Sequence, residues 1–262
     1  MIYTIPYYFL IPLFLCWGSF LNVLAYRLIV NQSIITPRSS CPCCSALIAW
    51  YDNIPVLSWF LLKGKCRSCK QPISFLYPFI EVLTAVALSL LYVYIPLQYF
   101  LGYFVFFSAL IVTIRTDIET MLILRHVTTF LVPVGIFMSA HRMLPLTVHE
   151  SICGAIFGYC FLLVVSKVFK YIRNMDGIGE GDFDLILFIG SFTGIIGCWI
   201  SITIGSILGS LYGICTLTLS HHDKDITDYL QTTKIPFGPF LAFGALIFTF
   251  LQKQIFHYLF IN

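Results

Sequence analysis

Charged residues are scarce in this chain of 262 residues. Asp, Glu, Lys and Arg make up 10% of it, apolar residues make up 59%, and the mean hydropathy is +0.91. In a soluble domain about a quarter of the residues are charged. The shortage excludes an ordinary globular domain, a disordered chain and a nucleic-acid binder that works through a basic surface. Together with 25 Phe and 15 Tyr residues, it indicates a chain surrounded by lipid.

Basic residues are missing from the N-terminal stretch, where the first Lys or Arg is Arg27. A secretory signal peptide starts with a basic region and ends at a cleavage site of small residues. Because the first apolar stretch has neither feature, we expect it to be retained as a membrane span.

Long apolar stretches fill most of the remaining sequence. A bilayer core about 30 Å thick requires about 20 mostly apolar residues per helix. The sequence predicts an all-α polytopic membrane protein with about eight transmembrane helices, although the fourth is short and the boundary near Trp199 indicates either a tight turn or one long hairpin. The expected spans are about 5–26, 79–96, 98–114, 126–140, 150–166, 184–199, 200–219 and 236–256.

The positions of the basic residues predict the topology. Counted against these spans, 13 of the 15 Lys and Arg residues lie on one side, which the positive-inside rule makes cytoplasmic. Both termini are then expected outside. The 13 residues are Arg27, Arg38, Lys63, Lys65, Arg67, Lys70, Arg115, Arg125, Lys167, Lys170, Arg173, Lys224 and Lys234, and the two exceptions are Arg142 and Lys253.

The expected domains are a first transmembrane helix (1–26), a polar segment on the cytoplasmic side (27–78) and a larger membrane domain (79–262). The polar segment holds five of the ten Cys residues. The other five lie in apolar spans, where Cys behaves as a small apolar residue. Those five are Cys16, Cys153, Cys160, Cys198 and Cys215.

Two Cys-x-x-Cys pairs in the polar segment predict a zinc site. Cys41 and Cys44 form the first pair, and Cys66 and Cys69 form the second after 21 intervening residues. Four thiolates suit tetrahedral Zn²⁺ and leave no open position for water, so the ion is expected to be structural. Disulfides are the alternative, which a reducing cytoplasm disfavours. A register that uses Cys43 instead of Cys44 would break the spacing.

Two carboxylates at the membrane face form a second candidate site. The predicted topology puts Asp117, after the third span, and Asp182, before the sixth, on the same side and at similar depth. Two adjacent carboxyl groups share one proton, so one can activate water while the other protonates a carbonyl or leaving group. Gly179 and Gly181 would let a peptide backbone come close to Asp182. The alternative is that Asp182 caps a helix.

These features together resemble the type IV prepilin peptidase family, whose members process pilins and secretion pseudopilins. Asp182 ends a G-x-G-D motif of the kind that defines this class of intramembrane aspartyl proteases. The motifs that carry the resemblance are GSFLNVLAYRL at 18–28, the two Cys pairs with YDNIPVLSW at 51–59, YPFIE at 77–81, GEGD at 179–182 and KIPFGPFL at 234–241.

The resemblance implies an activity, substrates and cofactors. Asp117 and Asp182 would be the catalytic pair of an inner-membrane endopeptidase that removes a short basic leader from prepilins or pseudopilins at the cytoplasmic face. Many members then methylate the new N-terminal residue with S-adenosylmethionine, an activity associated with the segment that corresponds to 27–78. A peptidase without methyl transfer is one alternative. A non-enzymatic assembly factor or transporter, with a zinc docking domain, is another.

The sequence departs from the family pattern at three places. The family often has Pro-Asp where this chain has Leu124-Arg125, a Lys where it has Asp184, and an Arg where it has Leu76. Asp184 puts a second carboxylate near Asp182, and we expect it to shift the pH optimum relative to members that have Lys.

Overall fold

The computed structural model describes residues 6–174, 177–219 and 235–260, which form helices and short 3₁₀ turns without a strand. Lys224 and Lys234 of the charge count lie outside the described residues. The elements are α1 (Tyr7–Ile29), η1 (Trp50–Asn53), α2 (Leu57–Leu61), α3 (Leu76–Tyr94), α4 (Leu97–Thr120), η2 (Thr129–Leu131), α5 (Val132–Ala140), α6 (Val148–Arg173), α7 (Glu180–Leu219) and α9 (Gly238–Phe260).

Five helices are long and apolar enough to cross a membrane, namely α1, α3, α4, α6 and α7. The expected fourth and eighth spans appear as shorter apolar helices, Thr129–Ala140 and Gly238–Gln252. The expected sixth and seventh spans both lie within α7. The all-helical class is therefore confirmed, whereas the count of eight transmembrane helices is not.

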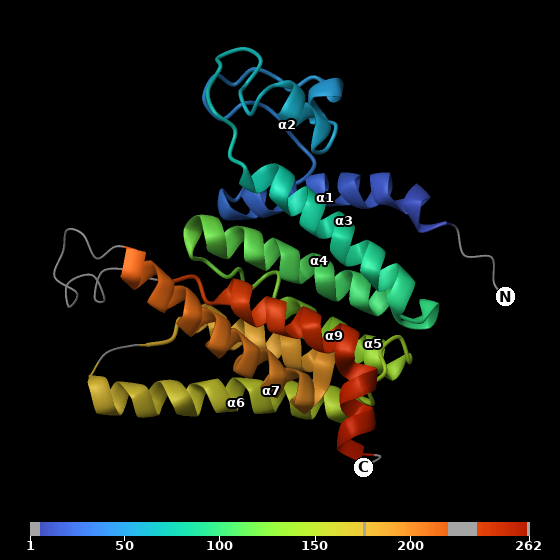
Figure 1. Cartoon of the computed structure of the whole chain (residues 1–262), viewed down its shortest axis with the longest axis vertical. Coiled ribbons are helices and arrows are strands. Elements are labelled where there is room, and N and C mark those ends of the chain that lie inside the picture. The colour runs from blue at the N-terminus through green and yellow to red at the C-terminus, as the bar shows by residue number, and fades with distance from the viewer. Residues whose placement is uncertain (1–5, 175–176, 220–234, 261–262) are drawn as a thin grey trace. The chain divides into compact units, whose positions relative to one another are not determined.

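Helix α7 folds back on itself at Gly194. As a straight helix its 40 residues would extend about 60 Å. The Cys198 thiol nevertheless donates to the Ile186 carbonyl at 3.6 Å, although twelve residues of straight helix would separate them by about 18 Å. The break has φ 71° and ψ −171°, a conformation essentially restricted to glycine. The turn expected near Trp199 therefore lies at Gly194, and Figure 1 draws the two halves in gold and orange.

The chain divides into two compact units, Met1–Thr116 and Asp117–Asn262, with the boundary inside α4. The expected boundaries at 27–78 and 79–262 stay a prediction. In the first unit α1 packs on α3 (Figure 1). A Cβ atom on Gly18 would lie 2.9 Å from the Glu81 Cα, so the two backbones approach closely at this point.

In the second unit α7 packs against both α6 and α9. Glycines allow close contact, because a Cβ atom on Gly154 of α6 would lie 2.5 Å from the Gly190 carbonyl of α7. Helix α6 starts at a capping box in which Thr147 and Glu150 satisfy each other's backbone N–H groups. It ends at Asn174, which has the left-handed conformation that often terminates helices.

Candidate active site and cysteine cluster

Asp117 and Asp182 come from two helix ends in the second unit. Asp117 is in the last turn of α4, and Asp182 is the third residue of α7. Asp182 is therefore not the N-cap, and its N–H donates to the Gly179 carbonyl at 3.1 Å. The two residues are only 4% and 8% exposed. The Asp117 carboxyl exerts a Coulomb repulsion on that of Asp182, so the two groups lie within electrostatic reach of each other.

Glycines shape the surroundings of both carboxyl groups. The Gly238 N–H, at the start of α9, donates to Asp117 Oδ2 at 2.9 Å. A Cβ atom on Gly238 would lie 2.7 Å from the same oxygen, and one on Gly179 would lie 3.3 Å from Asp182 Oδ2. The Ile123 side chain lies against both Gly181 and Gly238. Other groups can therefore come close to these carboxyl groups only because glycine, which has no side chain, occupies the neighbouring positions.

Sequence reasoning did not identify Gly238 as a site residue. Its only signal is a place in the 234–241 motif, because a backbone donor has no side-chain signature. Gly205 and Gly213 of α7 pack closely on the residues around it, since their Cβ atoms would lie 3.1 Å from Leu241 and 3.3 Å from Ile235. These contacts hold the start of α9 beside Asp117.

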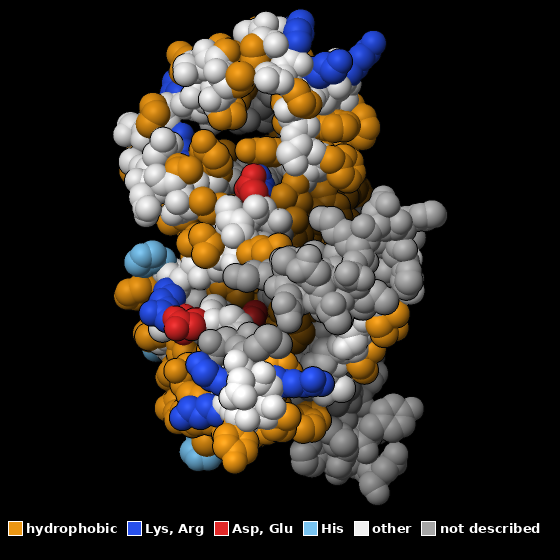
Figure 2. Space-filling model, turned by 90° about the vertical axis from the view of Figure 1, so that its left-hand side faces the viewer, with side chains coloured by type: hydrophobic (Ala, Val, Ile, Leu, Met, Phe, Trp, Pro, Cys, Tyr) orange, Lys and Arg blue, Asp and Glu red, His pale blue; other side chains and the backbone are white. Residues whose placement is uncertain are grey.

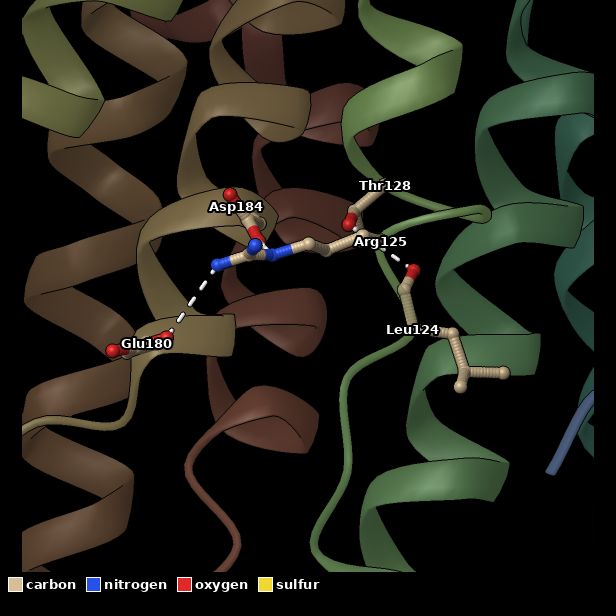
Figure 3. A network of polar contacts seen from close by, with 5 residues as sticks. All are labelled: Leu124, Arg125, Thr128, Glu180 and Asp184. Carbon is tan, nitrogen blue, oxygen red and sulfur yellow. Dashed lines mark hydrogen bonds and ion pairs between the residues drawn. The ribbon is translucent and has the colours of Figure 1, made fainter.

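An ion pair joins two of the residues that depart from the family pattern. Arg125 Nε donates to Asp184 Oδ2 at 2.8 Å, and Arg125 Nη2 lies 3.5 Å from Glu180 Oε2 (Figure 3). In the loop that carries Arg125, the Thr128 hydroxyl donates to the Leu124 carbonyl at 3.2 Å. Arg125 therefore offsets the charge of Asp184 and links the loop after α4 to the first turn of α7.

The four Cys residues of the two pairs come together in the first unit. Their sulfur atoms all lie within 4.8 Å of one another, and Cys41 and Cys69 have sulfurs 3.8 Å apart. Zn–S bonds of 2.3 Å in a tetrahedron separate the sulfurs by about 3.8 Å, so the cluster fits zinc. The exposed Cys43 is not in the group, which agrees with the register that uses Cys44.

The two Cys pairs adopt the same backbone turn. Cys41 N–H donates to Ala46 O, and Cys66 N–H donates to Gln71 O in the second copy. Backbone N–H groups of Cys44 and Cys43 donate to the Cys41 sulfur and lower its pKa to about 6. Those of Cys69 and Ser68 lower the pKa of Cys66 in the same way. Because N–H donors stabilise a thiolate, each turn prepares its first Cys to bind a cation.

Cys69 shows why four thiolates need a cation. The Gln71 N–H lowers its pKa, but burial and the neighbouring sulfurs of Cys44, Cys66 and Cys41 outweigh this donor and raise it to about 12. A metal ion at the centre of the cluster would reverse this balance.

A bidentate ion pair ties the second Cys pair to η1. Arg67 donates to the two carboxylate oxygens of Asp52 at 2.7 and 2.6 Å, and its guanidinium lies 5.4 Å from the centre of the Tyr51 ring. The hydrogen bonds from Arg67 hold the pKa of Asp52 below its usual range.

Glu81 of α3 holds a strained turn. Its Oε2 accepts the Val56 N–H at 2.7 Å. Val56 has φ 63° and ψ −54°, and the Leu57 N–H donates to the Pro55 carbonyl, which together make a γ-turn. This conformation is strained for a β-branched residue. Sequence reasoning had no signal for this role, because a γ-turn centred on Val is rare.

A cavity of about 370 Å³ opens beside the second Cys pair. Its lining includes the cations Lys63, Lys65, Arg67 and Lys70. S-adenosylmethionine has a sulfonium, an ammonium and a carboxylate group, so its net charge is positive. Among the described residues, the lining of this cavity holds no carboxylate that could offset that charge, so the cavity does not suit this cofactor.

Two family models match the sequence. The bacterial peptidase A24 N-terminal domain matches residues 13–95, and the type IV leader peptidase family matches residues 104–214. Together they cover both Cys pairs and both aspartates.

Curated proteins from several bacteria are similar over most of the chain. The prepilin leader peptidase/N-methyltransferase of Aeromonas salmonicida is 31% identical, covering 92% of this chain and 89% of that protein. The protein of the same name from Bacillus subtilis is 33% identical, covering 88% of each chain. The type 4 prepilin-like proteins leader peptide-processing enzyme of Escherichia coli is 29% identical, covering 90% of each. No solved structure was found to match the chain.

Proposed function

The chain belongs to the type IV leader peptidase family, and from this we propose that it removes the leader peptides of type IV prepilins or pseudopilins. The family resemblance seen in the sequence motifs is thereby confirmed. The proposal includes an eight-span arrangement in the bacterial inner membrane, with both termini outside and the aspartates at the cytoplasmic face. The charge distribution supports this topology.

The observation that carries the proposal is the pair of buried, interacting carboxyl groups of Asp117 and Asp182. We assign the ionised member as the general base that takes a proton from water while the water oxygen bonds to the peptide carbonyl carbon. The protonated member donates to the carbonyl oxygen. The C–N bond then breaks as the leaving nitrogen takes a proton, and a new carboxyl group and amine result.

Neighbouring groups support this chemistry in two ways. The Gly238 N–H fixes one oxygen of Asp117 and leaves the other for water or substrate. Gly179 and Gly181 place no side chain beside Asp182, which leaves space for an extended peptide. A substrate helix has to unwind at the cut, because its backbone groups are otherwise hydrogen-bonded within the helix.

Cleavage of a purified prepilin tests the mechanism. Asp117→Asn and Asp182→Asn should each lower kcat/KM by about 10²–10⁴-fold, the contribution typical of a general acid or base. Glu119→Gln is the matched control, because Glu119 is exposed in the same turn of α4 as Asp117. Near-normal cleavage by either Asn variant would refute the dyad. No cleavage by the parent protein would favour an assembly factor or transporter.

Methylation of the new N-terminal residue is a second proposed activity, favoured by the N-methyltransferase in the relatives' names. S-adenosylmethionine would supply the methyl group, but the cation-lined cavity does not suit it and we assign it no residues. Mass spectrometry of the processed pilin tests the activity. A product that never gains a methyl group in the presence of the cofactor would identify a peptidase alone.

We also propose that Cys41, Cys44, Cys66 and Cys69 hold one structural zinc ion. The ion would cross-link the two turns of a segment that is too short to bury a core of its own. Metal analysis should find one zinc per chain in the purified protein, and a chain without zinc would contradict the assignment.

A further inference from the structure

Helix α2 presents its apolar face outward. Leu57, Phe60 and Leu61 occupy positions i, i+3 and i+4, and they are 61%, 62% and 80% exposed. The intervening Ser58 is buried instead, with its hydroxyl donating to the Tyr51 carbonyl at 2.9 Å. A helix on a water-facing surface has the opposite arrangement. This exposed face would be more stable in an apolar environment than in water.

The contacts of α2 place it at the level of a membrane helix. The N–H of Val56, which precedes α2, donates to Glu81, five residues or about 7.5 Å along α3 from Leu76. The 19 residues of α3 extend about 28 Å, so α3 needs its whole length to cross a bilayer core of about 30 Å. The Trp59 indole donates to the Ile73 carbonyl at 3.1 Å and holds the inner side of α2 against the chain leading into α3.

Cations border the apolar face. Lys63, Lys65 and Lys70 are exposed and line the cavity beside α2 together with Arg67. Arg67 is paired with Asp52, whereas within the described residues no carboxylate pairs with the three lysines. Figure 2 shows Lys and Arg side chains beside hydrophobic ones at the end of the molecule where Figure 1 draws α2. An apolar helix face with adjacent lysines is the pattern of helices that lie in the membrane interface.

We propose that α2 anchors the Cys-rich segment in the membrane interface, with Leu57, Phe60 and Leu61 among the lipid chains and Lys63, Lys65 and Lys70 on the phosphates of anionic phospholipids. The segment leads into the candidate membrane helices α1 and α3 at its two ends, so it is always held close to a bilayer. The inference is independent of the proposed peptidase activity. The occupant is lipid rather than a basic leader peptide, because the lysines would repel such a peptide.

Hydrogen exchange of the full-length protein in lipid nanodiscs tests this anchor. The amides of 57–62 should exchange about fivefold more slowly in discs that contain phosphatidylglycerol than in discs of phosphatidylcholine alone. The triple variant Lys63→Gln/Lys65→Gln/Lys70→Gln should lose this difference. Phe60→Ser/Leu61→Ser should exchange faster in both kinds of disc. Lys167→Gln/Arg173→Gln, which removes two exposed cations of α6, is the matched control and should behave as the parent does.

Three results would overturn the proposal. Equal exchange in the two kinds of disc would show that anionic lipid is not recognised. Protection by inorganic phosphate in phosphatidylcholine discs would identify a small-anion site. Protection that arises only when a prepilin is added would identify a peptide-docking surface. Zinc analysis of each variant, with the parent content expected, separates loss of the anchor from loss of the Cys cluster.

Discussion

The position of Asp117 depends on a backbone group rather than on a neighbouring side chain. Its Oδ2 accepts the Gly238 N–H, and no residue larger than glycine fits beside it, since a Cβ atom would lie 2.7 Å from that oxygen. Contacts this close are essentially never seen for real Cβ atoms. Gly238 thus acts through Asp117 as a positioning residue.

Gly238→Ala should therefore lower kcat by about 10²-fold with little change in KM, because a 1 Å displacement of a catalytic group costs about that much. Gly209→Ala is the control, since its Cβ would lie 3.5 Å from the nearest atom, an ordinary contact. Prepilin cleavage and thermal stability should be measured for both variants. Loss of stability without loss of kcat in the folded fraction would limit Gly238 to a packing role.

The Asp52–Arg67 pair should make the stability of the Cys-rich segment depend on pH. Because Arg67 lowers the folded pKa of Asp52, the pair contributes stability above the unfolded pKa of about 3.9, and this contribution is lost as the pH falls through the folded pKa. Asp52→Asn should then unfold at a lower temperature than the parent at pH 7. The difference should shrink as the pH falls below about 4 and vanish once the pH is below the folded pKa of Asp52. The unfolding temperature of both proteins can be measured at each pH by tryptophan fluorescence.

Arg67→Gln should give the same pH pattern, since it removes the other half of the pair. The thiols are identical in all three proteins, so their own protonation cancels in the differences. A difference between parent and variants that persists unchanged at low pH would rule out the ion pair as its cause.

At the residue scale, the sequence predicts groups whose side chains carry the chemistry. Asp117, Asp182 and the four Cys ligands have distinctive spacing, and the structure brings each set together. Gly238 and the Glu81–Val56 contact could not be predicted. One acts through a backbone N–H, and the other depends on a turn that is visible only when α3 lies beside α2.

An ion pair between Arg125 and Asp184 joins two elements of the second unit, and its charges are reversed relative to the family pattern. The family often has Asp and Lys where this chain has Arg125 and Asp184, and these two residues bond to each other here. The two departures from the family pattern therefore compensate each other. The pair holds the loop after Asp117 to the turn that carries Asp182.

A charge swap tests this link. Arg125→Asp or Asp184→Lys alone places like charges together and should reduce prepilin cleavage several-fold, whereas the double variant should recover most of it. Glu180→Gln is the control, because Glu180 is 90% exposed and its contact with Arg125, at 3.5 Å, is longer than the 2.8 Å contact of Asp184. If the double variant is no better than the worse single variant, the pair does not position the site.

A further variant at this ion pair, Arg125→Gln, addresses the expected effect of Asp184 on the pH optimum. Arg125 offsets the carboxylate charge of Asp184 in the parent, so the shift relative to members with Lys should be small. In Arg125→Gln that carboxylate loses its cation, and the optimum should move to higher pH because protons are held more tightly near added negative charge. An unchanged pH–rate profile in Arg125→Gln would show that the charge of Asp184 does not influence the pH optimum.

At the scale of elements, the positions of the apolar helices could be predicted, but the break in α7 could not be placed. Apart from Ser191 and Thr193, the residues that flank Gly194 are mostly apolar and none is charged, so hydropathy gives no clear boundary there. The actual break depends on a backbone conformation that glycine alone adopts readily, and many glycines in this chain are helical.

At the scale of the whole molecule, the two candidate sites belong to different compact units. The cysteine cluster lies in Met1–Thr116, and the aspartate pair lies in Asp117–Asn262. The sequence separates the two sites by about 50 residues but does not indicate a division inside α4, because a continuous helix has no linker composition. Units that are separately compact should respond separately when one of them is disrupted.

Removing zinc tests this separation. Cys41→Ser or Cys69→Ser should release the ion and accelerate hydrogen exchange across 40–72, because two thiolates in each turn are needed to close the cluster. Methylation of the processed pilin should fall more than cleavage does, since Asp117 and Asp182 lie in the other unit. Cys43→Ser is the matched control and should keep its zinc, because this thiol is not in the cluster. Equal zinc content in all three variants would refute the metal site, and a parallel loss of both activities would show that the units do not act independently.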